Sequence, residues 1–188
     1  MRESRLYSIL RPFISFLFKL IYRPKIIGKD NIPKSGRVIL AGNHTSILDA
    51  PFLISTTKRN IHFLAKKELW EGAFKIFFSN MGLICVDRSK KDGKSLVLAK
   101  KYLDDDKVIG IFPEGTISKG NLLDFKKGAA LLSKETNSLI VPFVIRGKYK
   151  VFSKDLTIKF LKPIKCIGDP IKETDKLKDI INIEREKI

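Results

Sequence analysis

The chain has 188 residues, 44% of them apolar, which is enough for one domain of ordinary size with its own core. Thirty-seven Lys and Arg against twenty Asp and Glu give a net charge of +17. The mean hydropathy of -0.05 excludes a multi-span membrane protein, and the charge implies an anionic partner: nucleic acid, an anionic bilayer, or a phosphorylated or acidic substrate.

The first segment, LYSILRPFISFLFKLIY at positions 6–22, is rich in Leu, Ile and Phe. A membrane-spanning helix needs ~20 largely uncharged residues, whereas Arg11 and Lys19 interrupt this run. Cations around bulky apolar side chains are typical of a helix that lies in the interface of an anionic membrane. We therefore expect residues 1–26 to form an N-terminal interfacial helix; a helix packed on the domain's own core is the alternative. The remainder, 27–188, then forms one domain.

Short apolar runs predict the strands of that domain, and apolar residues at helical spacing predict its helices. The expected strands are 37–42, 61–65, 83–86, 108–112, 139–145 and 156–160. The expected helices are 68–81, 94–103, 125–135 and a tail from Thr174 onward. Strands that alternate with helices predict an α/β fold with a largely parallel or mixed central sheet flanked by helices.

Polar motifs follow three of these strands. They are Asn43-His44, Asp87-Arg88 and the run Pro113-Glu114-Gly115-Thr116. Ligands of open α/β sheets bind at the carboxyl ends of the strands, so these motifs are expected at one rim of the sheet.

His44 and Asp49 are the strongest candidates for catalysis. A neutral imidazole is the usual general base near neutral pH, and it needs one ring nitrogen free and the other held by an acceptor. Asp49 can be that acceptor, as the Asp of a serine-protease triad is. A substrate hydroxyl would then take the place of the serine. A His-Asp pair alone is weak support, because many loops contain one by chance.

Four sequence blocks, NHTSILD, GLICVDR, FPEGT and IVPFVI, occur in that order. Together they resemble the motifs of the glycerolipid acyltransferases, the group of 1-acylglycerol-3-phosphate acyltransferases. The resemblance runs from about Gly28 to Pro163, and the combination of four blocks is highly specific. It implies that 27–188 is an acyltransferase domain and that His44 and Asp49 are its catalytic pair.

The resemblance also implies where the acceptor binds. Arg88 corresponds to the phosphate-binding Arg of the second block, and an Arg grips phosphate bidentately. Glu114, Gly115 and Thr116 belong to the third block, which is tied to acceptor binding. Lys67 is a further phosphate candidate by position; Lys66, Lys126 and Lys127 are weaker ones. The family usually has Arg after this Thr, whereas this chain has Ile117, so the acceptor head group stays open.

By this resemblance the chain transfers an acyl chain from acyl-CoA or acyl carrier protein to a lysophospholipid. The foremost acceptor is 1-acylglycerol-3-phosphate (lysophosphatidic acid), giving phosphatidic acid in phospholipid biosynthesis. No metal or other cofactor is expected. The expected location is an anionic membrane surface, at the cytoplasmic face of the inner (plasma) membrane.

Two alternatives come from other functional classes. A nucleic-acid-binding domain explains the net charge but not the His-Asp pair, and the aromatic residues lie in core-like stripes; we therefore expect no nucleic acid partner. A lipid hydrolase could use the same His with water, but the chain has no GxSxG nucleophile elbow. Cys85 and Cys166 lie in apolar runs and are predicted to be buried, reduced thiols.

Overall fold

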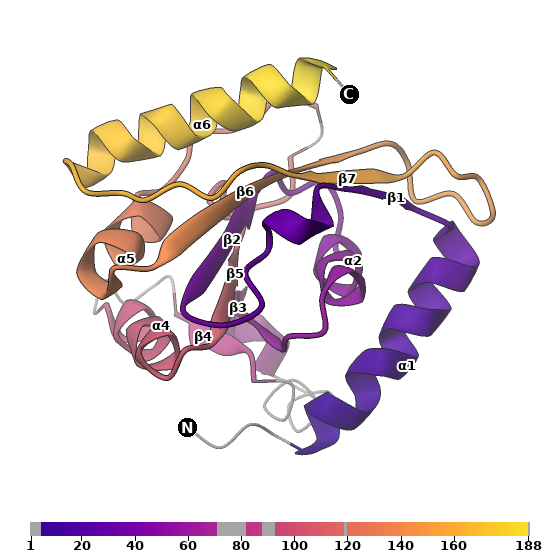
Figure 1. Ribbon diagram of the computed structural model, residues 1–188, viewed down its shortest axis with the longest axis horizontal. Coiled ribbons are helices and arrows are strands. Elements are labelled where there is room, and N and C mark those ends of the chain that lie inside the picture. The colour runs from indigo at the N-terminus through magenta and orange to yellow at the C-terminus, as the bar shows by residue number, and fades with distance from the viewer. Residues whose placement is uncertain (1–4, 71–81, 88–92, 119, 188) are drawn as a thin grey trace.

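The computed structural model describes residues 5–70, 82–87, 93–118 and 120–187, and within them seven strands form one sheet (Figure 1). The strand order is β1-β7-β6-β2-β5-β3-β4. Their bounds are β1 Lys25–Ile27, β2 Val38–Gly42, β3 Ile61–Lys66, β4 Ile84–Val86, β5 Val108–Ile111, β6 Leu139–Arg146 and β7 Thr157–Phe160.

The sheet is mixed but largely parallel, as predicted. β2 lies between β6 and β5 and pairs parallel with both, Leu40 being opposite Val141 and Gly110. β3 and β4 continue the parallel part, whereas β7 is antiparallel to β6 and β1 is parallel to β7. Because β2, β3, β5 and β6 run the same way, their carboxyl ends meet at one edge of the sheet. The predicted catalytic residues follow β2, so this edge is called here the catalytic edge.

Helices cover both faces of this sheet (Figure 1). One face carries α1 (Arg5–Tyr22) and α2 (Asp49–Thr56), and the other carries α4 (Lys94–Asp104), α5 (Gly128–Thr136) and α6 (Pro170–Lys187). The buried strand β2 supplies both layers, since Val38 and Leu40 join the core under α1 and α2 while Ile39 and Ala41 join the other. This alternation is the period of two that a strand imposes on its side chains.

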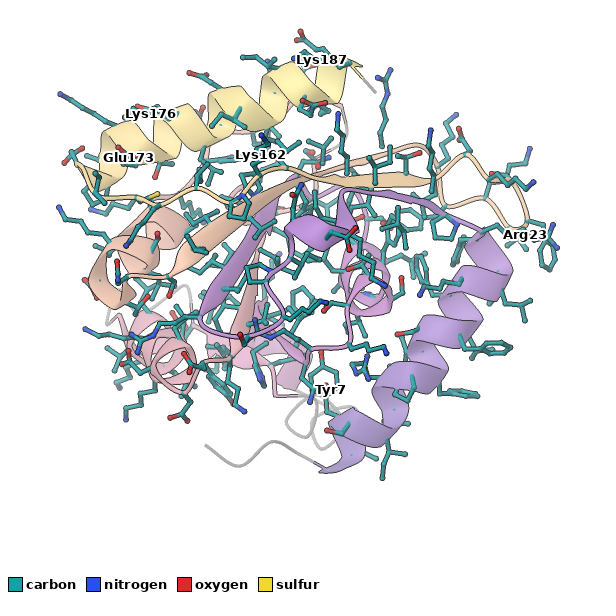
Figure 2. All side chains as sticks on the ribbon, viewed as in Figure 1. Tyr7, Arg23, Lys162, Glu173, Lys176 and Lys187 are labelled. Atoms are coloured by element: carbon teal, nitrogen blue, oxygen red, sulfur yellow. The ribbon has the colours of Figure 1, made fainter. Side chains whose placement is uncertain are left out.

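The helix α1 runs along the domain from the amino edge of the sheet to the catalytic edge. Near its start, the hydroxyl of Tyr7, labelled in Figure 2, exchanges hydrogen bonds with the backbone of Ile61 at the beginning of β3. Near its end, Phe18 stacks on Phe52 with ring centroids 5.1 Å apart. The inner side of α1 is therefore part of the core.

The outer side of α1 is apolar and exposed. Its exposed large side chains are Leu6, Ile9, Phe13, Phe16, Leu17 and Leu20. An amphipathic helix of a globular domain normally turns charged residues outward, so this arrangement is the reverse of the usual one. Within the described residues, no helix is both long and apolar enough to cross a bilayer.

Apart from the predicted helix 68–81, the predicted elements are confirmed with small shifts at their ends. The helix expected from Phe125 begins at Gly128, and the C-terminal helix begins at Pro170, before the expected Thr174. The predicted helix 68–81 lies mostly outside the described residues, and its first residues belong to a 3-10 turn, Lys67–Trp70. The strand β1 was not predicted.

One expectation about the cysteines is wrong. Cys166 is buried as predicted, whereas Cys85 is exposed. The reason is that β4 is the edge strand of the sheet, so an apolar run there is covered on fewer sides than in a central strand.

Candidate active site

The candidate catalytic residues lie in the turn between β2 and α2, at the catalytic edge. Asn43 fixes the start of this turn, because its side-chain amide donates to the carbonyl of Ile145 at 2.8 Å and its oxygen accepts from the Ile145 N–H at 2.8 Å. The turn is thereby attached to the neighbouring strand β6 by a buried side chain. His44 follows directly.

His44 and Asp49 are in contact, as predicted. His44 Nδ1 lies 2.8 Å from Asp49 Oδ2, and the carboxylate is fully buried. Because the carboxylate of Asp49 can only accept, it favours the tautomer of His44 with the proton on Nδ1. This tautomer leaves the lone pair of Nε2 available. Among the residues that the structure describes, none forms a hydrogen bond with Nε2. The pair therefore has the geometry of a general base held by a carboxylate.

Asp49 is fixed from several directions. Its Oδ2 also accepts the backbone N–H groups of Thr45 at 2.6 Å and Ser46 at 2.9 Å, in the manner of a carboxylate at the first turn of a helix. Its Oδ1 accepts the hydroxyl of Tyr149, from the loop after β6. Burial first, and then the adjacent carboxylate of Asp49, raise the pKa of Tyr149, so this phenol stays protonated and donates.

An aromatic side chain supports the imidazole. The ring of His44 stacks on Phe112 with centroids 4.1 Å apart and planes 15° apart. Phe112 in turn stacks on Phe63, with centroids 6.1 Å apart. The stack keeps water from one side of the imidazole and fixes the plane in which Nε2 is presented.

Glu114 is buried and holds the backbone of the turn that carries His44, called here the catalytic turn. Its Oε1 accepts the N–H of His44 at 2.7 Å, and its Oε2 accepts the N–H of Leu123 at 2.9 Å. Ser118 holds the carbonyl of His44, to which its backbone N–H donates at 2.8 Å. Both carboxylate oxygens of Glu114 thus have backbone partners, and its contact with a substrate stays a prediction.

The turn that Glu114 begins also brings a lysine to the rim. Gly115 has φ +71°, which favours glycine, and a Cβ there would lie 2.8 Å from Nζ of Lys126. Lys126 therefore extends across this turn, and its backbone N–H donates to Pro113 at 2.9 Å. Thr116 is exposed beside it. The conformation of Gly115 and the position of Lys126 bring one of the weaker phosphate candidates to the rim.

Of the remaining predicted binding residues, the structure describes Lys67. Lys67 follows β3, and its Nζ is 3.5 Å from Asp87 Oδ2. Asp87 directly precedes Arg88, which lies outside the described residues. The ion pair is exposed on the Lys67 side and contributes little stability. It does hold Lys67 close to the edge strand β4, which β5 and β3 separate from β2.

Two of the residues that organise this site were missed in the sequence. Tyr149 lies 100 positions from Asp49, and no local pattern connects them. Ser118 follows the third block and shows no motif of its own. In the described part of the chain, no group of three or more His, Cys, Asp or Glu side chains is placed to hold a metal ion.

A separate hollow of about 410 Å³ lies at the opposite, amino edge of the sheet. Its lining includes Arg11, Lys58, Arg59 and Lys107. The guanidinium of Arg59 donates there to the carbonyls of Pro33, Gly36 and Asp106, which ties loops together. The candidate active site is therefore the one at His44. An imidazole, a carboxylate that accepts from it and an aromatic ring stacked on it meet there, whereas the described residues that line this hollow include no histidine.

Comparisons with known proteins identify the family of this chain. A family model described as Acyltransferase matches residues 23–146. A 1-acyl-sn-glycerol-3-phosphate acyltransferase of Helicobacter pylori is 36% identical over 124 residues, 63% of this chain and 52% of the relative. An enzyme of the same name from Borreliella burgdorferi is 33% identical over 135 residues, which are 70% of this chain and 54% of that relative. The chain thus spans about half the length of these curated relatives.

A solved structure has the same fold. The crystal structure of the 1-acyl-sn-glycerophosphate (LPA) acyltransferase from Thermotoga maritima matches with a TM-score of 0.77 at 22% sequence identity. The match covers 97% of this chain and 79% of that one. It includes α1 as well as the sheet, since nearly the whole chain is aligned.

Proposed function

Because this chain belongs to the acyltransferase family, we propose that it transfers an acyl group from acyl-CoA or acyl carrier protein to a lysophospholipid. The acceptor we propose is 1-acylglycerol-3-phosphate, which gives phosphatidic acid. The names of its relatives support that acceptor. The observation that carries the reaction type is the 2.8 Å contact between His44 Nδ1 and the buried Asp49.

The proposed reaction is a direct transfer. Nε2 of His44 takes the proton from the acceptor hydroxyl, whose oxygen attacks the thioester carbonyl carbon. The tetrahedral intermediate then collapses, the C–S bond breaks, and the thiolate takes the proton back from the imidazolium. Asp49 stabilises that imidazolium, and its fixed position avoids reorganisation during the step. The products are the new ester and the free thiol, and the proposed chemistry needs no metal or prosthetic group.

The acceptor phosphate would be held by cations at the same edge. Lys126 extends across the turn at Gly115 beside the catalytic turn, Lys67 lies further along the edge, and Arg88 is the family's phosphate residue by sequence. Ile117 stands where the family usually has Arg, and its side chain is 42% exposed. The lysines would therefore have to supply the positive charge that this position lacks.

We place the enzyme on an anionic membrane at its cytoplasmic face. The exposed apolar side of α1 supports this, because it offers six large side chains to a bilayer and the chain carries a net charge of +17. A lyso-lipid acceptor resides in such a bilayer, whereas the thioester donor arrives from water.

The test is an assay of the purified protein with lysophosphatidic acid in vesicles and either labelled acyl-CoA or acyl carrier protein. Wild type should form phosphatidic acid, and His44→Ala should be at least ~100-fold slower, because it removes the general base. A panel of other lyso-lipids tests the head group. Retained turnover in His44→Ala would exclude the mechanism, and release of free fatty acid alone would indicate a hydrolase.

A further inference from the structure

The loop that joins β6 and β7 exposes two large apolar side chains. It covers residues 147–155, with the sequence GKYKVFSKD. At its tip, Val151 is 54% exposed and Phe152 is 59% exposed. An isolated exposed apolar residue needs no explanation, but two in succession at the tip of a lysine-rich loop do.

The tip of this loop is attached to the end of α1 (Figure 1). The N–H of Phe152 donates to the carbonyl of Ile21 at 2.7 Å, which satisfies a terminal carbonyl of the helix. The guanidinium carbon of Arg23, labelled in Figure 2, lies 5.2 Å from the centroid of the Phe152 ring. The tip is thereby held at the C-terminal end of α1.

The backbone here adopts conformations that non-glycine residues rarely use. Phe152 has φ 57°, Lys154 has φ 41° and Arg23 has φ 45°. For an aromatic residue this region is unfavourable, and such conformations persist only where neighbouring contacts impose them. These contacts turn a Phe outward instead of burying it. A conformation maintained against the backbone's preference is a reason to look for a function of the exposed ring.

The charges around the tip suit an anionic surface. The loop contributes Lys148, Lys150 and Lys154, and Arg23 adds a fourth cation. The acidic residue of the loop, Asp155, accepts the backbone N–H of Lys148 at 3.1 Å. Apolar side chains ringed by Lys and Arg match the interface of a bilayer that contains anionic lipids.

The loop also lies at the edge where catalysis is proposed. β6 runs parallel to β2, so the loop after Arg146 emerges at the same edge as the turn that carries His44. Tyr149 anchors the base of the loop there, because its hydroxyl donates to Asp49. A contact between this tip and a membrane would bring the catalytic edge toward the lipids that contain the acceptor.

We propose that the loop 147–155 is a second membrane-contact element, in which Val151 and Phe152 enter the interface of an anionic bilayer beside α1. The proposal rests on the membrane location given under the proposed function and adds the part of the surface that orients the active site. Binding through α1 alone would involve only the outer side of that helix, whereas the tip adds a contact beyond its C-terminal end, beside the catalytic edge. Contact at this second point would help to hold the catalytic edge against the bilayer.

The first test is sedimentation with vesicles of phosphatidylcholine and phosphatidylglycerol. The double variant Val151→Ser/Phe152→Ser should bind about tenfold more weakly than wild type, since interfacial affinity scales with buried apolar area. The matched control is Ile171→Ser/Ile183→Ser, which changes two equally exposed residues on α6, at the opposite face of the sheet. The control should bind as wild type does.

The outcomes separate the two proposals. If wild type fails to sediment with vesicles, the membrane location itself is wrong. If wild type binds and the loop variant binds equally well, the location stands and the loop proposal is overturned. If the control loses as much as the loop variant, the effect is a general loss of apolar surface, and the loop proposal is again overturned.

A second measurement does not use the Val151→Ser/Phe152→Ser variant, so it holds even if that variant fails to fold. A polarity-sensitive fluorophore is attached at Val151→Cys in a Cys85→Ser background, because Cys85 is exposed whereas Cys166 is buried. Vesicles should shift its emission to the blue and increase its intensity. The same label at Ile171→Cys should not respond. An unchanged emission at position 151, with the protein bound to vesicles, would contradict the proposal.

Discussion

The hydroxyl of Tyr149 donates a hydrogen bond to Oδ1 of Asp49, while Oδ2 of the same carboxylate holds His44. Tyr149 packs against α1 through Tyr22, with ring centroids 5.7 Å apart, and against Phe18 at 6.2 Å. The carboxylate of Asp49 is therefore connected to α1 by one side chain. Tyr149 acts through Asp49 and is a positioning residue.

Replacing Tyr149 with Phe should reduce kcat about tenfold, because it removes one donor to a buried carboxylate and keeps the ring. Without the donor from Tyr149, the carboxylate of Asp49 would attract a protonated His44 more strongly. The acidic limb of the pH–activity profile should therefore move to higher pH. Steady-state kinetics between pH 5 and 9 measure both effects. Tyr22→Phe is the control and should leave the profile in place. An unshifted profile in Tyr149→Phe would mean that the hydrogen bond has a structural role only.

Stability at alkaline pH should depend on the same phenol. Burial raises the pKa of Tyr149 above its ordinary value near 10, so the folded protein keeps a proton that the unfolded chain loses. The stabilisation is fully present below pH ~10 and falls as pH rises, by about 1.4 kcal/mol per pH unit. Urea unfolding at pH 8 and pH 11 should show a steeper loss for wild type than for Tyr149→Phe. Equal losses in the two proteins would contradict this assignment.

Glu114→Gln distinguishes a backbone-holding role from substrate binding. A neutral amide has one oxygen, so either His44 or Leu123 would lose the acceptor of its N–H group, at a cost of about 1–3 kcal/mol. We expect a lower Tm and a lower kcat with the acceptor KM unchanged. Thermal unfolding and kinetics with varied lysophosphatidic acid measure these. A raised KM with an unchanged Tm would support the substrate contact predicted from the sequence instead.

Lys126→Gln should raise the KM for lysophosphatidic acid about three- to tenfold at low salt. Lys126 lies across the turn at Gly115, where its charge can reach an acceptor phosphate. Added salt should narrow the difference from wild type, because the attraction is screened. Lys134→Gln, at an exposed lysine in the last turn of α5, is the matched control. Identical KM values for the two variants at both salt concentrations would remove Lys126 from the binding site.

Strand ends are where the sequence was most informative. Apolar runs that stop at His44 and at Pro113 place both motifs at the catalytic edge, and the structure shows these motifs in contact through Glu114. That contact was not predictable, because a motif indicates a residue's importance and not its partner. The buried Glu114 accepts two backbone N–H groups. This role does not produce a recognisable spacing of residues in the sequence.

Tyr149 was missed for a different reason. It lies in a polar, lysine-rich loop that resembles any surface connection, and only the pairing of β6 with β2 brings it to Asp49. β1 was missed because three residues carry no periodicity, and its pairing with β7 forms between segments more than 120 positions apart in the chain. Cys85 shows the same limit, since an apolar run does not reveal whether its strand is central or at an edge.

The attachment of Asn43 to Ile145 determines how the active site can move. The two hydrogen bonds continue the β2–β6 pairing one residue beyond the strand, and they are buried. Amide protons in such positions exchange with solvent only when the surrounding sheet opens, so the exchange of the Ile145 amide should report global unfolding and not local fluctuation. The turn that carries His44 is thus attached to the centre of the domain at its first residue. In the proposed reaction, the lipid acceptor and the acyl thioester would therefore have to adjust to the position of His44.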